Sequence, residues 1–350
     1  MTTLSHEQVL VSTGPRSGLP VIVAVHSTVL GQAVGGCRMW TYGDWRDGLE
    51  DALRLSSAMT LKCALAGLPL GGGKSVIALP LGTELTASRR RDVLLDLGDV
   101  IESLGGRYGV GEDVGTTADD MATVAERTRY AYGLPEASGG MGEPSTPTAV
   151  GVYESLRTTS EFLWGTPDLA GRRVTVVGLG QVGSRLAEQL RADGAKLTVA
   201  DIDGSKKRLA ADLGAEWVDV DDALSVETDV LVPAALGGIL TSSTAAQLRC
   251  AAVVGPANNQ LADDSVADLL AARGILWAPD FLVNAGGVVY GFEMEMGSKD
   301  LDRAMAAVKR IGTTLRDVFA RADQDSSTPL AAALAVAEDR IAVRRGPAGA

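Results

Sequence analysis

Residues 172–190 read RRVTVVGLGQVGSRLAEQL and place a strand, a glycine-rich turn and a helix in immediate succession. The β-branched run VTVV (174–177) is typical of a buried strand, and the segment from 184 to 194 has apolar residues at helical spacing. Between them lies the pattern Gly-x-Gly-x-x-Gly at 178–183. A strand, this turn and a helix in that order predict the first unit of a dinucleotide-binding fold.

Each glycine of this turn has a separate physical role in such a fold. Gly178 suits the tight turn, Gly180 lets the backbone approach a pyrophosphate, and Gly183 allows close packing of helix on strand. The N–H groups and the positive dipole end of the helix then face the anion. The remaining expected cofactor contacts in the turn are Gln181 and Val182.

An acidic residue ends the second strand, KLTVAD (196–201). Asp201 follows Gly183 at the distance at which a carboxylate accepts hydrogen bonds from the adenosine ribose hydroxyls. Because it repels a 2′-phosphate, NAD is predicted rather than NADP. The basic run at 206–208 is a competing signal for a phosphate, and we interpret it as a solvated helix start.

The segments around this motif alternate between strands and helices. The predicted strands are RRVTVVG, KLTVAD, TDVLVPA, AAVVGPA and ILWAPD. This alternation predicts an α/β fold with a doubly wound parallel sheet. A stretch rich in Gly, Ser and Pro at 138–147 is a candidate hinge, so we expect a Rossmann domain over 143–324. Residues 1–142 also predict strands and helices but contain no dinucleotide motif.

Composition restricts the function classes. The net charge of −12 argues against nucleic-acid or anionic-membrane partners, and no window approaches 18 uninterrupted apolar residues. Three scattered cysteines and an N-terminus without an export pattern favour a reducing, cytoplasmic location. The chain has only two histidines, His6 and His26, which argues against zinc sites and Ser-His-Asp triads. We therefore expect no metal, and proton transfer by lysines and carboxylates.

The stretch LPLGGGKSVIALP (68–80) invites comparison with a phosphate-binding loop. That loop requires a glycine five residues before Gly73, where this chain has Leu68. Ser75 also leads directly into an apolar run typical of a strand, whereas a phosphate loop opens a helix. The pattern therefore predicts that Lys74 does not bind phosphate.

Several motifs in order resemble the glutamate/leucine/phenylalanine/valine dehydrogenases, and within them the phenylalanine and leucine branch. They are AVGGCRMW (33–40), MTLKCALAGLPLGGGKSVI (59–77), GEDVGTT (111–117), GLGQVG (178–183), GPANNQLAD (255–263) and APDFLVNAGGVV (278–289). The resemblance implies NAD(P)-dependent oxidative deamination of an L-amino acid to a 2-oxo acid and ammonia. It also implies a homo-oligomer, a cleft between the two domains, and a C-terminal helix, about 325–350, that packs back onto the N-terminal substrate domain.

The resemblance also implies roles for individual residues. Lys62 resembles the lysine that binds the substrate α-carboxylate, Lys74 the catalytic lysine in a glycine-rich loop, and Asp113 the aspartate that exchanges protons with the amino group. Gly35 and Gly36 match the pair that lets backbone lie against substrate. Three further positions match residues near the nicotinamide or the substrate: Thr148, Asn258 and Asn284.

Pocket positions give a partial prediction of the substrate. Glutamate-specific relatives carry a lysine where this chain has Val34, and a carboxylate buried against valine is costly, so an apolar side chain is favoured. Gly111 and Gly291 stand where leucine-preferring relatives carry larger residues, which favours phenylalanine. Val288 and the loop EDVGTT (112–117) favour a branched-chain substrate instead.

Two other classes of function are compatible with a dinucleotide site. A non-catalytic sensor of dinucleotide and amino acid predicts the loss of Lys74 or Asp113, and both are present. A hydroxy-acid dehydrogenase typically needs a histidine as its acid and base, and neither His6 nor His26 lies in a suitable loop.

Overall fold

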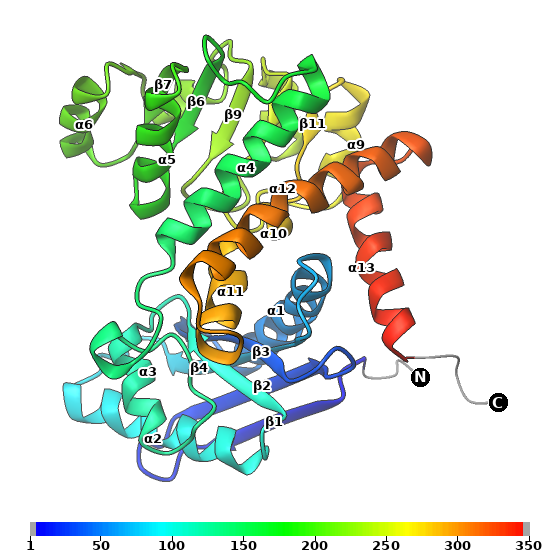
Figure 1. The fold of residues 1–350 in the computed structure, drawn as a ribbon. Coiled ribbons are helices and arrows are strands. Elements are labelled where there is room, and N and C mark those ends of the chain that lie inside the picture. The colour runs from blue at the N-terminus through cyan, green and yellow to red at the C-terminus, as the bar shows by residue number, and fades with distance from the viewer. Residues whose placement is uncertain (1–4, 346–350) are drawn as a thin grey trace. The chain divides into compact units, whose positions relative to one another are not determined.

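In the computed structural model, which describes residues 5–345, the chain forms two units (Figure 1). Unit 1 contains the described residues up to Glu143, the short segment Met294–Lys299 and the described residues from Ala337 on. Unit 2 contains Pro144–Glu293 and Asp300–Val336. The return of Met294–Lys299 to unit 1 was not predicted; Glu295 fixes it there by accepting hydrogen bonds from the backbone N–H of Gly133 and Met141.

Unit 1 is built on a five-stranded mixed sheet in the order β1-β2-β4-β3-β5. β3 pairs in parallel with both β4 and β5, whereas β2 pairs antiparallel with β1 and β4. The strands are β1 (Gln8–Thr13), β2 (Pro20–Ser27), β3 (Ala33–Tyr42), β4 (Gly71–Pro80) and β5 (Tyr108–Glu112), and the helices are α1 (Trp45–Leu65), α2 (Ala87–Ser103) and α3 (Ala118–Ala125). A short η1 (Glu136–Ser138) follows.

Both faces of this sheet are covered, which explains the uninterrupted apolar run of β2. Ile22 and Ala24 point to one face and pack with Ala52 of α1. The alternate residues of β2 point to the other face and join a core with α2 and α3: Val21, Val23, Val25, Val93, Leu94, Leu97, Ile101 and Val124. Asp44 begins α1 through a capping box with Asp47.

The three glycines before Lys74 lie inside β4 and not in a loop, which corrects the sequence-based expectation. A Cβ at Gly72 would lie 2.1 Å from the backbone nitrogen of Thr60 in α1. A Cβ at Gly73 would lie 2.5 Å from the ring of Tyr108. The glycines are therefore required because the strand packs directly against a helix and an aromatic ring, a reason that the sequence pattern alone does not distinguish from a loop.

Unit 2 contains a six-stranded sheet in the order β11-β10-β9-β6-β7-β8, with parallel pairing throughout. This confirms the predicted doubly wound parallel sheet. Its strands are β6 (Arg173–Val177), β7 (Lys196–Ala200), β8 (Glu216–Trp217), β9 (Val230–Pro233), β10 (Ala252–Val253) and β11 (Leu276–Trp277). β6, which leads into the glycine motif, lies between β7 and β9, so the carboxyl ends of three strands meet at the predicted cofactor site.

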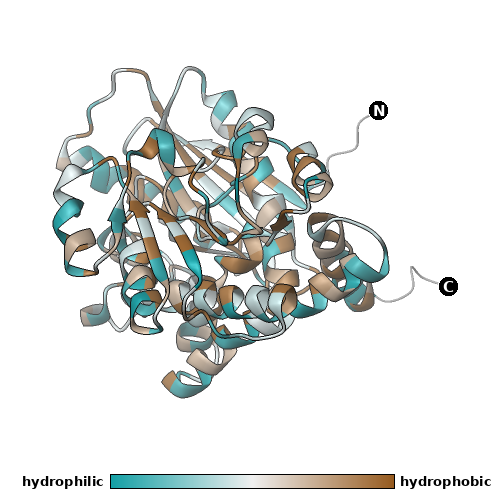
Figure 2. Cartoon of the chain, turned by 90° about the horizontal axis from the view of Figure 1, so that it is seen from above, coloured by the Kyte–Doolittle hydropathy of each residue, from teal (hydrophilic) through white to brown (hydrophobic). Residues whose placement is uncertain are grey.

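The helices of unit 2 cover this sheet. They are α4 (Ser145–Trp164), α5 (Gln181–Ala192), α6 (Lys207–Asp212), α7 (Val220–Ala223), α8 (Ser242–Gln247), α9 (Ser265–Ala272), α10 (Asp280–Val283), α11 (Gly286–Gly291) and α12 (Leu301–Gln324), with a short η2 (Gly204–Lys206). A short η3 (Phe292–Met296) begins in unit 2 and ends in unit 1. α12 packs along α4, and α13 (Pro329–Arg345) runs from unit 2 into unit 1, where Arg340 donates to the carbonyl of Ala64. Many helices have one hydrophobic and one hydrophilic side (Figure 2). None of the helices within 5–345 has the length and apolarity needed to span a bilayer.

Candidate active site

Lys74 and Asp113 form an ion pair in unit 1. Lys74 lies in the middle of β4 and is 6% exposed, and Asp113 directly follows β5. The Nζ of Lys74 donates to Oδ2 of Asp113 at 2.7 Å. The structure thus brings together the two residues to which the resemblance assigns proton transfer.

This ion pair crosses an intervening strand. β3 lies between β4 and β5, so the strands that carry Lys74 and lead to Asp113 are about 10 Å apart. A Cβ at Gly36 of β3 would lie 2.6 Å from the Cβ of Asp113, and a Cβ at Gly35 would lie 1.9 Å from the carbonyl oxygen of Gly73. Gly36 therefore keeps the space over β3 clear, which allows the lysine to reach the carboxylate, whereas Gly35, which points to the other face, lets β3 lie close to the backbone of β4.

A third charged residue, which the sequence analysis did not select, faces the same carboxylate. Arg38 lies on β3, and its Nε is 3.4 Å from Oδ2 of Asp113. Residues two apart on a strand point to the same face. Arg38 could therefore have been selected from the sequence, because it lies two residues after Gly36. Burial raises the pKa of the Asp113 carboxyl, but the Lys74 ammonium and the Arg38 guanidinium lower it more, and the pKa lies below its ordinary value.

The other predicted substrate residues of unit 1 lie on neighbouring elements. Lys62 is in the last turn of α1, two residues after Thr60, the residue that lies against Gly72. Val34 is buried in β3 beside Gly72. Gly111 of β5 pairs with Gly36, and a Cβ there would meet only the carbonyl oxygen of Tyr132, at 3.9 Å. Gly111 therefore has space on its side-chain face.

The glycine motif of unit 2 has the geometry of a pyrophosphate site. Gly178 has a φ of 109°, which favours glycine, and a Cβ at Gly183 would lie 2.0 Å from the carbonyl oxygen of Gly178. By contrast, a Cβ at Gly180 would meet nothing within 4 Å. No side chain caps the N-terminus of α5, which begins at Gln181. The turn therefore presents an open, positively polarised helix end, and the residues present fit a dinucleotide.

Asp201 lies at the end of β7, next to this turn. Its Oδ2 accepts from the backbone N–H of Leu179 at 2.6 Å, and its Oδ1 accepts from that of Asp203 at 2.8 Å. The carboxylate thus also fixes the glycine turn, while its remaining lone pairs can accept ribose hydroxyls. Within the basic run that follows, Lys207 and Arg208 are exposed, and the Nζ of Lys207 lies 5.5 Å from the ring centroid of Trp217.

Three predicted residues meet near the N-terminus of α11. Nδ2 of Asn284 donates to Oδ1 of Asn258 at 2.7 Å, and a Cβ at Gly286 would lie 2.8 Å from the Cα of Thr148. The Oδ1 of Asn284 is buried and has no hydrogen-bond partner among the described residues. A buried acceptor without a partner is suited to a donor on a ligand, such as a carboxamide. Val288 and Gly291 lie on α11.

Two exposed apolar side chains that the sequence analysis did not select lie at the carboxyl ends of strands in the parallel sheet of unit 2, next to the glycine motif. Ile202 directly follows Asp201 and is 91% exposed, and Leu236 follows β9 and is 79% exposed. β7 and β9 flank β6, so both residues follow strands next to the glycine motif. Both side chains are therefore accessible to a ligand bound at the glycine motif. The available signal was an apolar residue directly after Asp201, the aspartate expected to bind the ribose.

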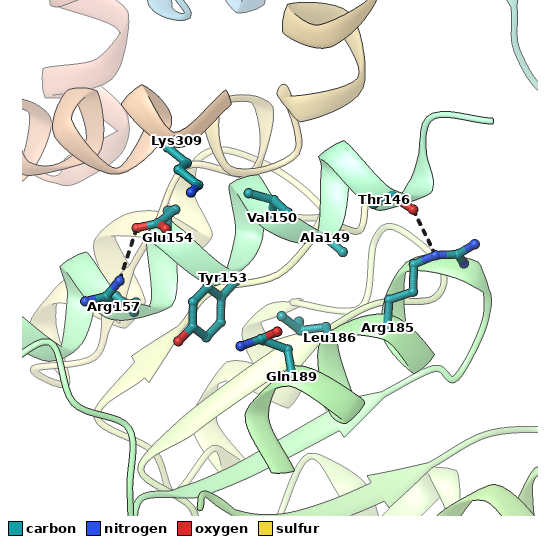
Figure 3. Close-up of a pocket in the computed structure, with 10 residues that line it drawn as sticks. All are labelled: Thr146, Ala149, Val150, Tyr153, Glu154, Arg157, Arg185, Leu186, Gln189 and Lys309. Carbon is teal, nitrogen blue, oxygen red and sulfur yellow. Dashed lines mark hydrogen bonds and ion pairs between the residues drawn. The ribbon is translucent and has the colours of Figure 1, made fainter. Parts of the chain in front are cut away.

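A cavity of about 560 Å³ lies elsewhere in unit 2, between α4, α5 and α12 (Figure 3). Its lining includes Tyr153, Arg157, Arg185 and Lys309, and none of the predicted site residues. Arg185 is tied to the start of α5, because its Nη1 donates to the carbonyl oxygen of Gln181. The cavity is thus separate from the residues that carry the expected chemistry.

Comparison with known proteins agrees with this arrangement. Residues 6–130 match the family "Glu/Leu/Phe/Val dehydrogenase, dimerisation domain", and residues 199–345 match "Glutamate/Leucine/Phenylalanine/Valine dehydrogenase". Residues 153–243 also match the "D-isomer specific 2-hydroxyacid dehydrogenase, NAD binding domain". The last match covers the β6–α5–β7 unit that contains the glycine motif.

Individual relatives are similar over almost the whole chain. A phenylalanine dehydrogenase from Bacillus thermotolerans is 40% identical, with 97% of this chain and 89% of the relative covered. A leucine dehydrogenase from Thermoactinomyces intermedius is also 40% identical, with 99% and 93% covered. The crystal structure of L-tryptophan dehydrogenase from Nostoc punctiforme is 35% identical, with a TM-score of 0.86 and 98% and 97% covered. The chain therefore belongs to the glutamate/leucine/phenylalanine/valine dehydrogenase family and is an NAD-dependent amino-acid dehydrogenase.

Proposed function

We propose that the enzyme oxidatively deaminates an apolar L-amino acid, with phenylalanine preferred and leucine or valine as the alternative. The reaction consumes the amino acid, water and NAD and releases the 2-oxo acid, ammonium, NADH and a proton. The observation that carries the aromatic preference is the space beside Gly111, which pairs with Gly36 next to the Lys74–Asp113 ion pair. The likeness to a tryptophan dehydrogenase supports the same preference, whereas the equal identity to a leucine dehydrogenase supports the alternative.

In this proposal three side chains of unit 1 act on the substrate. Lys62 binds the α-carboxylate, and an ammonium at that position both orients and neutralises it. Once the hydride has left the α-carbon, that carbon is an iminium carbon. Lys74, after losing its own proton, takes a proton from the water that adds there. Asp113, bonded to Lys74 at 2.7 Å, exchanges protons with the departing amino group. Burial of Lys74 excludes bulk water from this exchange.

The proposed cofactor contacts are those of unit 2. Gly178, Gly180 and Gly183, with Gln181 and Val182, hold the pyrophosphate at the start of α5, and Asp201 binds the adenosine ribose. Thr148, Asn258 and Asn284 lie at the nicotinamide end, where the unpartnered Oδ1 of Asn284 accepts from the carboxamide. Bound NAD supplies the hydride acceptor.

We also propose that the enzyme is a homo-oligomer assembled through unit 1. The support is the match of residues 6–130 to a family described as a dimerisation domain. Amino acid, 2-oxo acid and ammonia are then the small-molecule partners, and neither nucleic acid nor membrane is expected at a net charge of −12.

A panel of substrates tests the proposed function. NADH absorbance is followed with L-phenylalanine, L-tryptophan, L-leucine, L-valine and L-glutamate at saturating NAD, and again with NADP. The highest kcat/KM is expected for phenylalanine, with overlapping activity on leucine and none on glutamate, because Val34 offers no cation to a side-chain carboxylate. A higher kcat/KM for leucine or valine would establish the alternative, and activity on glutamate would contradict both.

Gly111→Ala is expected to change this preference. The added methyl group fits without strain, since its only close neighbour is an oxygen at 3.9 Å, but it narrows the space on that face. We expect the ratio of kcat/KM for phenylalanine to that for leucine to fall about 10-fold. Gly204→Ala is the matched control, because a Cβ there is equally unstrained, with nothing within 4 Å, but lies in unit 2. An unchanged ratio would place the substrate side chain away from Gly111.

A further inference from the structure

Arg38 is fixed from behind by a second carboxylate. Its Nη1 donates to Oδ2 of Asp51 at 2.6 Å, and the hydroxyl of Tyr42 donates to the same oxygen at 2.9 Å. Arg54 donates to the other oxygen, Oδ1, at 2.7 Å. Asp51 lies on α1, so the guanidinium is anchored on a helix that packs against the sheet.

The front of Arg38 faces the proposed catalytic pair. Oδ2 of Asp113 accepts from Lys74 at 2.7 Å and lies 3.4 Å from Nε of Arg38, so one carboxylate oxygen is placed between two cations. The path from α1 to the pair thus runs through Asp51, Arg38 and Asp113. Arg54 touches Asp51 only on the far side of this path, and its side chain is 58% exposed.

We propose that Arg38 is a positioning residue for the deamination reaction, holding the Asp113 carboxylate in place for Lys74 while Asp51 holds Arg38. This proposal rests on the roles proposed above for Lys74 and Asp113. A guanidinium does not lose its proton in proteins, so Arg38 stays charged while Lys74 and Asp113 exchange protons. A fixed charge beside the carboxylate also lowers the pKa of Asp113, so that Asp113 stays ionised next to Lys74.

Two further ionisable groups near this carboxylate, Cys37 and Tyr108, are neutral near pH 7. Burial raises the pKa of the Cys37 thiol to about 12, and burial also raises the pKa of the Tyr108 hydroxyl. The charges that face Asp113 are therefore Lys74 from β4 and Arg38 from β3. Loss of Arg38 removes one of these two cations, which raises the pKa of the Asp113 carboxyl.

Arg38→Ala, Arg38→Lys and Arg54→Ala test this proposal in the full-length enzyme. For Arg38→Ala we expect kcat for the preferred amino acid to fall about 10- to 100-fold, with NADH binding unchanged. The acid limb of its pH–rate profile moves to higher pH by about one unit. Arg38→Lys keeps the positive charge, so the midpoint of the acid limb is expected to return to the wild-type pH and kcat to recover in part. Arg54→Ala, which also removes a donor to Asp51, leaves both quantities unchanged.

The outcomes separate positioning from a purely structural role and from failure of the catalytic assignment. If Arg38→Ala loses thermal stability and kcat with an unchanged pH midpoint, or if Arg54→Ala reproduces its changes, the positioning role is wrong. Asp113→Asn is measured in parallel. If Asp113→Asn retains wild-type turnover, the catalytic assignment of Asp113 fails and the positioning role fails with it; if Asp113→Asn is inactive while Arg38→Ala is normal, only the positioning role is overturned. The proposed function itself fails only if the wild-type enzyme forms no NADH with the amino-acid panel.

Discussion

Lys74→Ala is expected to reduce turnover of the amino acid by about 1,000-fold while leaving NAD binding unchanged. Lys74 is the buried cation that contacts Asp113, and alanine can neither take a proton from water nor hold that carboxylate. The glycine motif lies in unit 2, so the loss is confined to unit 1. The measurements are steady-state NADH formation with the preferred substrate and binding of NADH followed by its fluorescence.

Three further variants make this result specific. Lys74→Met keeps most of the volume of the side chain and separates a packing defect from the loss of the ammonium. Lys196→Ala removes an exposed lysine of β7 and is expected to behave as wild type. Lys74→Ala with Asp113→Asn is expected to lose little more than Lys74→Ala alone, because the two groups act as one unit. A Lys74→Ala enzyme with near-normal turnover would remove the catalytic assignment.

Strands that are buried on both faces could be predicted from the sequence, because their apolar residues are continuous. Strands whose apolar pattern is interrupted by glycine or charged residues could not be predicted in this way. The runs PVIVAVH and VTVV correspond to β2 and β6, where continuous apolar residues leave no other interpretation. β3, AVGGCRMWTY, was not predicted as a strand because two glycines and an arginine interrupt its pattern. Its pairing with β4 and β5 is fixed by neighbours distant in sequence, which a local pattern does not report.

The same limit applies to the site. The glycine motif of unit 2 is a local signal, and its expected turn, helix and aspartate are found within 24 residues. The Lys74–Asp113 contact joins residues 39 apart on strands separated by a third. Only the sheet order shows why Gly36 must lack a side chain, and only then does Arg38, two residues further along the same strand, become a candidate. The sequence suggested the participants through a resemblance, whereas their contacts required the fold.

Gly180→Ala is expected to weaken NAD binding at least 10-fold without destabilising the fold. The φ of Gly180 is −70° and its ψ is −163°, a conformation open to alanine, and the added methyl group meets nothing within 4 Å. In the proposed complex, however, the pyrophosphate lies against this backbone, so the methyl group occupies the space of the ligand. Isothermal titration with NAD and a thermal unfolding curve of the free enzyme measure the two effects separately.

Gly183→Ala is expected to destabilise the fold, in contrast to Gly180→Ala, which is expected to weaken NAD binding alone. Its Cβ would lie 2.0 Å from the carbonyl oxygen of Gly178, so the turn and α5 must move apart, and we expect a loss of about 3 kcal/mol in unfolding free energy. Gly204→Ala, on the same unit with an equally open position, is expected to change neither quantity. If Gly180→Ala binds NAD as tightly as wild type, the dinucleotide does not cross the start of α5, and the cofactor contacts proposed for Gln181 and Val182 fail with it. If Gly180→Ala loses NAD binding but keeps its thermal stability, the added methyl group clashes with the ligand and not with the protein. That result would place the pyrophosphate at Gly180.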